Sequence, residues 1–177
     1  MTPLVSDATS AVLSLHCVVV KGDGGSVRDK RFVAEHRGGP LRQAQHRQLI
    51  GWARRCSEHV LPLLQTPVDR RLKVALSVAT EWEHGKASVG EARTASFGAN
   101  HAAQQATDPV AVAVSRSVGQ AVATAHMADH SLGAAWYALK AISRTGGNVE
   151  EERKWQDRQL PPEIRELVQS ARMKKNL

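Results

Sequence analysis

The sequence predicts an all-α protein, a single-domain helical bundle of about six helices with one long central helix. Apolar residues recur three and four positions apart in several segments, which is the spacing of one face of a helix. Hydrophobic residues make up 42% of the 177 residues, but aromatic residues make up only 4%. Alanine takes their place, and small side chains let neighbouring helices approach closely. We therefore expect packed helices rather than a β-sandwich.

The first 28 residues are the least informative part of the chain. The apolar segment 11–20 suits either a short strand or a helical turn, and the glycine-rich segment 22–25 breaks it. We treat residues 1–28 as an N-terminal extension of uncertain structure and residues 29–177 as the all-helical domain. A second break, at 37–40, precedes the first helix.

The first helix is predicted over residues 41–64. Pro62 is expected to kink or fray it, because proline removes a hydrogen bond from a helix, and Pro67 follows its end. The second helix is predicted over 68–84. The positions in helical register are Leu49, Trp52, Ala53, Cys56, Val60, Leu63 and Leu64 in the first helix, and Leu72, Ala75, Val78, Ala79 and Trp82 in the second.

Capping signals mark the remaining helices. Ser88 followed by Glu91 predicts a capping box at the start of a third helix, which carries small residues along one face. Asp108 and Pro109 open the long central helix, predicted over 108–144 with a bend near 115–119 or near Gly133. Two shorter helices follow, at 149–159 and from 161 to about 173. The small residues of the third helix are Ala92, Ala95, Gly98, Ala99, Ala102 and Ala106.

Net charge indicates the class of partner, and cysteine content indicates the cellular compartment. The chain has 24 Lys and Arg against 17 Asp and Glu, a net charge of +7, which favours an acidic partner. The basic residues are scattered in short groups, which argues against a nucleic-acid surface. Cys17 and Cys56 form no CxxC pair or disulfide framework. With no secretory signal and no membrane-spanning run expected, we predict a cytoplasmic protein.

The densest group of reactive side chains lies in the predicted central helix. On a continuous helix His126, Asp129, His130 and Tyr137 share one face, opposite the strongest apolar face. Three interpretations remain open: a solvated polar face, a metal site and an acid–base site. Two histidines one turn apart can chelate a divalent metal, but a site needs three or four ligands. No HExxH pattern is present, so no metal or other cofactor is predicted.

An acid–base site would use a histidine oriented by a carboxylate, with His126, Asp129 and His130 as the catalytic residues. Glu81, His84 and His101 are the residues that could join them from other helices. The segment 81–84 has two interpretations, a polar cluster facing the central helix or a solvated helix terminus. His46 is interpreted as a satisfied histidine at the edge of the core. The sequence contains no nucleophile elbow and no phosphate-binding loop.

Six stretches, in this order along the chain, resemble the bacterial family of putative immunity proteins, small all-helical proteins linked to polymorphic toxin systems. The resemblance extends from about residue 29 to residue 167. The stretches are DKRFVAEHRGGPL (29–41), HRQLIGWARRCSEHVLP (46–62), ASVGEAR (87–93), ATAHMADHSLGA (123–134), ERKWQ (152–156) and LPPEIRE (160–166).

The resemblance implies an inhibitor that binds and neutralises a cognate protein toxin by protein–protein contact. A homodimer is also compatible with alanine-faced helices. The alternative is a small-molecule enzyme or ligand-binding protein that uses the His/Asp cluster between helices. A His/Asp cluster that is enclosed beside a cavity would favour the alternative. A flat, solvent-exposed cluster would favour a protein partner. The candidate binding residues are Glu81, His84, His101, His126, Asp129, His130 and Tyr137.

Overall fold

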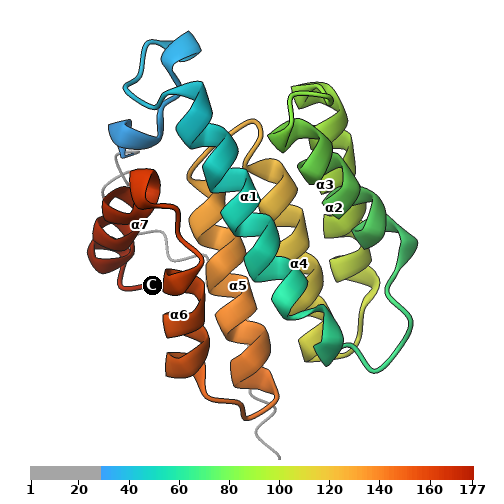
Figure 1. The fold of residues 1–177 in the computed structure, drawn as a ribbon. Coiled ribbons are helices and arrows are strands. Elements are labelled where there is room, and N and C mark those ends of the chain that lie inside the picture. Colours follow the sequence, from blue (N-terminus) through green and yellow to red (C-terminus); the bar gives the residue numbers. More distant parts are fainter. Residues whose placement is uncertain (1–28) are drawn as a thin grey trace, which may run out of the picture.

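The computed structural model describes residues 29–177, and this part of the chain is an all-helical bundle, as predicted (Figure 1). Within it the backbone forms no β-strand, apart from an isolated bridge between Ala34 and Leu41. The segment 11–20, predicted as a strand or a helical turn, lies outside the described residues. The α-helices are α1 (Gln43–His59), α2 (Arg70–Glu83), α3 (Val89–Gln105), α4 (Pro109–Ala123), α5 (His130–Arg144), α6 (Val149–Arg158) and α7 (Pro162–Lys175).

Short 3-10 helices complete the described range: η1 (Lys30–Phe32), η2 (Glu35–Arg37) and η3 (Leu61–Leu63). The disruption expected at Pro62 is confirmed, because α1 ends at His59 and Pro62 lies inside η3. The capping box of Ser88 and Glu91 is also confirmed at the start of α3. None of the helices from residue 29 onward is both long and apolar enough to cross a membrane.

The long central helix predicted over 108–144 is corrected by the structure: it is two helices, α4 and α5, that fold back on each other as a hairpin (Figure 1). The turn between them contains neither glycine nor proline. The Thr124 hydroxyl donates to the Gln120 carbonyl at 3.1 Å, and the Ser131 hydroxyl donates to the Ala128 carbonyl at 2.7 Å. Side chains therefore bond the backbone where the helix ladder stops.

Packing explains why the chain turns. A continuous helix over this range would be about 54 Å long and would leave much of its apolar surface in water. In the hairpin, Ser117 on α4 donates to the Ala134 carbonyl on α5 at 2.8 Å. Ala53 of α1, Ala121 of α4 and Ala134 of α5 form a buried cluster at the same level. The small side chains thus permit the close helix approach expected from the composition.

The core extends to both sides of this hairpin. On one side, Trp52 of α1 packs with residues of α5 and α7 such as Leu132 and Ile164, and its indole N–H donates to the Gln156 carbonyl at 2.9 Å. On the other side, the alanine face of α3 packs against Val118 and Val122 of α4. The two sides of the hairpin therefore pack against different helices.

Candidate functional site

The predicted histidines lie at one end of the bundle, in the turn from α4 to α5. His126 stands within the turn and His130 begins α5, and both side chains are half-buried. Their ring centroids are 5.2 Å apart. His130 Nδ1 donates to the Gln120 side-chain oxygen at 2.7 Å, which fixes the orientation of that ring. The pair predicted from sequence is therefore brought together, but in a turn rather than on a helix face.

His46 holds the turn to the rest of the bundle. It is buried at the start of α1, and its Nε2 donates to the Thr124 carbonyl at 2.6 Å. Its ring also packs edge-on against Trp82 of α2, with centroids 4.8 Å apart. Burial lowers the pKa of His46, although the bond to Thr124 acts in the opposite direction. The interpretation of His46 as a satisfied histidine at the core edge is confirmed.

The segment from η1 to η2 covers this end of the bundle and adds residues that the sequence did not connect with the site. His36 and Arg37, both exposed, line a small space together with His46 and His126. The space has a volume of about 10 Å³. The two residues precede α1 and lie far from His126 in sequence, so helical spacing could not relate them. We call this surface, formed by His36, Arg37, His126, Asp129 and His130, the histidine end.

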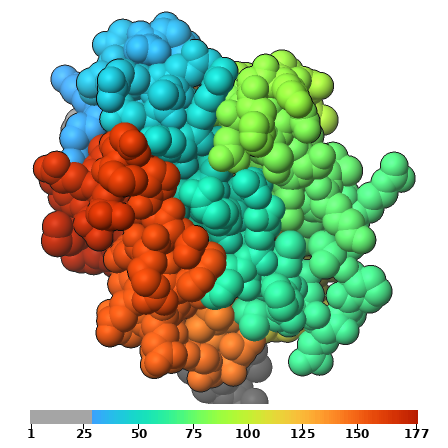
Figure 2. Space-filling view, viewed as in Figure 1, coloured from blue at the N-terminus to red at the C-terminus, as the bar shows by residue number. Residues whose placement is uncertain are grey.

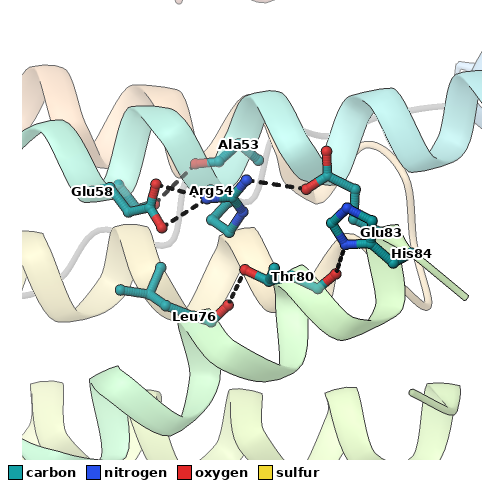
Figure 3. Close-up of polar contacts among 8 residues, drawn as sticks. Ala53, Arg54, Glu58, Leu76, Thr80, Glu83 and His84 are labelled. Carbon is teal, nitrogen blue, oxygen red and sulfur yellow. Dashed lines mark hydrogen bonds and ion pairs between the residues drawn. The ribbon is translucent and has the colours of Figure 1, made fainter. Parts of the chain in front are cut away.

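The C-terminal end of α2 contacts α1 and contributes no residue to the histidine end (Figure 3). Arg54 of α1 lies between two carboxylates, donating to Glu58 at 2.8 Å and to Glu83 at 3.2 Å. His84 Nδ1 donates to the Thr80 carbonyl at 2.7 Å, so it satisfies a carbonyl of its own last turn. Glu81 is exposed on the same helix. The geometry of Glu83 and His84 is that of a helix terminus.

His101 and Tyr137 lie apart from the histidine end. His101 is on α3, where Arg71 donates to its Nδ1 at 3.3 Å. Arg71 is in the first turn of α2, whereas Trp82, which contacts His46, is in its last turn. Because these two turns lie about 16 Å apart along the helix, His101 is far from His46. Tyr137 is half-buried two turns after His130, and its ring packs edge-on against Trp136 at 4.8 Å. The structure does not unite the seven predicted binding residues in one site.

The remaining reactive groups show no site of their own. Cys56 is fully buried, and burial raises the pKa of its thiol, which keeps it protonated and unreactive. Across the described range, no three side chains of His, Cys, Asp or Glu gather in a way that could hold a metal ion. What the histidine end offers is a partly exposed surface of three imidazole groups, one guanidinium group and the carboxylate of Asp129.

Comparison with known proteins finds one matching family. A family model described as Imm-5 like putative immunity protein matches residues 39–163, which is more than half of the chain. The match runs from the loop before α1 to the first turn of α7 and includes the turn that carries His126 and His130. No curated protein and no solved structure matches the chain.

Proposed function

The chain belongs to the Imm-5 like putative immunity protein family, and from this membership we propose that it binds and neutralises a protein toxin by protein–protein contact. The toxin is the class of partner that the family description implies. Neutralisation here means that the folded surface of the chain covers a surface that the toxin needs for its activity.

The observation that supports contact over catalysis is the lack of room beside the reactive side chains. The space that His46 and His126 line measures about 10 Å³, which is close to the volume that one water molecule needs. Pockets for small molecules measure roughly 300–1,000 Å³. The space also has no Asp or Glu among the residues that line it. The histidine end is therefore better suited to contact with another protein.

The charge of the histidine end indicates the chemistry of the toxin surface. Arg37 is exposed beside His36, and the half-buried His126 and His130 add imidazole groups that accept or donate hydrogen bonds. The whole chain carries a net charge of +7. We therefore propose that the toxin presents an acidic surface to this end, and that long-range attraction speeds the encounter. We place this encounter in the cytoplasm.

The test is co-expression in a laboratory bacterium with a candidate toxin whose expression stops growth. The wild-type chain is expected to restore growth. Arg37→Glu combined with His130→Ala should abolish the rescue, because the first reverses the charge and the second removes the imidazole contact. Arg144→Glu is the matched control, since Arg144 is exposed at the far end of α5. Growth that is not restored by the wild type would contradict the proposal.

A further inference from the structure

Exposed apolar side chains concentrate on the hairpin of α2 and α3. Among residues 29–177, four large apolar side chains are exposed, and three of them belong to α2 or α3. Val74 is 46% exposed on α2, and Phe97 is 68% exposed on α3. Figure 2 shows α2 and α3, in the green range, at the edge of the molecule beside α1. Large apolar side chains exposed on two neighbouring helices are typical of a contact surface.

A groove runs between α2 and α3 on this edge, with a volume of about 660 Å³. Val74 and Val78 line it from α2, and Ala95 and Gly98 line it from α3. The small residues of α3 leave space between the helices, so side chains from another helix can enter. The groove contains none of the histidine-end residues, and it is a separate surface.

The outward face of α2 has a charge at each end. Arg70, Val74, Val78 and Glu81 follow one another at spacings of four, four and three, so they share one face of the helix. Arg70 and Glu81 are both exposed, about 16 Å apart along the axis. Neither side chain has a hydrogen bond or an ion pair in the described part of the chain. We call these four residues the α2 stripe.

The order of residues in the α2 stripe makes it complementary to itself. When a second copy of α2 is laid against it in the opposite direction, Arg70 of each copy faces Glu81 of the other. Within one residue of that register, about 1.5 Å along the axis, Val74 of each copy faces Val78 of the other. Antiparallel helices pack this way in bundles, at axis distances of about 8–10 Å. A two-fold axis relates all of these contacts, as in the commonest protein dimers.

We propose that the α2 stripe and the adjoining groove form a homodimer interface, with Val74 and Val78 of each copy seated in the α2–α3 groove of the other. A second copy of this chain supplies both the apolar groups and the opposite charges in the matching register. Arg71 is less available for such a pair, because Asp69 already holds its guanidinium at 2.6 Å. The charge pairs are therefore assigned to Arg70 and Glu81.

The interface and toxin binding are independent claims. The histidine end is formed by residues of η2 and of the α4–α5 turn, and it shares no residue with the α2 stripe or the groove. The expected assembly therefore has one toxin-binding surface on each protomer. Failure of one claim leaves the other untouched.

Sedimentation equilibrium and light scattering of the full chain, over a wide range of concentrations, test the proposal. The wild type is expected at twice the chain mass. Val74→Glu should weaken the dimer by more than about tenfold, because it buries a carboxylate in an apolar contact. Since Val74 is exposed in the protomer, this change should leave the melting temperature of the monomer near that of the wild type.

Charge exchange provides the sharper test. Arg70→Glu and Glu81→Arg alone should each weaken the dimer, because each brings two like charges together twice in the symmetric complex. The double variant should restore the wild-type affinity. Both changes suit the α2 dipole, with the acid at its N-terminus and the base near its C-terminus, so neither should unfold the helix. Arg158→Glu on α6 makes the same charge change elsewhere and should leave the dimer intact.

A monomeric wild type would overturn the proposal, and so would a dimer that Val74→Glu does not affect. A double variant that stays as weak as the single variants would overturn the proposed register. If the wild type is monomeric and Val74→Glu abolishes toxin neutralisation, the groove is a toxin surface instead. In that case the proposal of a homodimer fails while the proposed function stands.

Discussion

His46 and Thr124, 78 positions apart in the chain, are joined by a hydrogen bond of 2.6 Å from the imidazole Nε2 to the backbone carbonyl oxygen. The carbonyl lies just beyond the last residue of α4, where the helix ladder no longer supplies a partner. The buried histidine satisfies it and thereby fixes the α4–α5 turn on α1. This contact between distant segments therefore helps to position the turn that carries His126 and His130.

Stability should fall as the pH drops below about 6.5, the ordinary pKa of histidine. Burial lowers the pKa of His46 in the folded protein. As the pH falls below the ordinary pKa, this side chain is therefore protonated in the unfolded chain before it is protonated in the folded one. The free energy of unfolding therefore decreases as the pH falls from the ordinary pKa to the lowered one. The contribution of His46 to stability is complete only above the ordinary pKa. Urea unfolding at several pH values measures this effect.

His46→Gln separates this histidine from the others. The variant should be less stable than the wild type at neutral pH by about 1–3 kcal/mol, because the amide can still donate to the carbonyl but lacks the buried ring that packs against Trp82. The difference between the two proteins should shrink as the pH falls. A difference that stays constant across this range would show that His46 does not titrate as its burial requires.

Ser117→Ala should destabilise the bundle by about 1–3 kcal/mol, because it removes the two buried hydrogen bonds of this hydroxyl, each of which contributes about 0.5–1.5 kcal/mol. The Ser117 hydroxyl lies 2.7 Å from the Ser57 hydroxyl and donates to the Ala134 carbonyl at 2.8 Å. It therefore connects α1, α4 and α5 at one buried point. Ser77→Ala, at an exposed position of α2, is the control and should change the free energy of unfolding by less than about 0.5 kcal/mol. Equal effects in thermal or urea unfolding would refute the role given to Ser117.

Gly39→Ala should disturb the segment that covers the histidine end. A Cβ atom at Gly39 would lie 2.0 Å from the backbone oxygen of Val33, which cannot move without shifting the segment. The expected cost is about 2 kcal/mol or more. Gly90→Ala is the matched control, because the nearest atom to its Cβ would be the Ser88 hydroxyl at 3.7 Å. That change should stabilise α3 by about 0.5–1 kcal/mol, as alanine usually does in a helix. If Gly39→Ala is as stable as the wild type, the segment is not packed as described.

Local signals made most of the fold predictable. The capping box of Ser88 and Glu91, the cap at Asp108 and the break at Pro62 each depend on neighbours a few positions away, and each occurs in the structure. The split between α4 and α5 was not predictable in this way. No glycine or proline marks it, and its cause is the packing of Ser117 and Ala134 across the hairpin.

The candidate site was less predictable than the fold. His126 and His130 were identified because they are close in sequence, whereas Arg37 reaches the same surface only through the tertiary fold. The sequence does carry a signal for the α2 stripe. Val74 falls between Leu72 and Ala75, which both face the core, so helical spacing directs it outward. A large apolar residue off the buried stripe is the pattern that indicates a contact surface.

Isothermal titration of the purified chain into its purified toxin tests the central claim most directly. We predict a saturable complex with one toxin per chain, an affinity that falls as salt is added, and loss of toxin activity at the equivalence point. Arg37→Glu combined with His130→Ala should weaken this complex by at least about tenfold, whereas Arg144→Glu should not. A toxin that stays fully active in excess of the chain, with no heat of binding, would contradict the account.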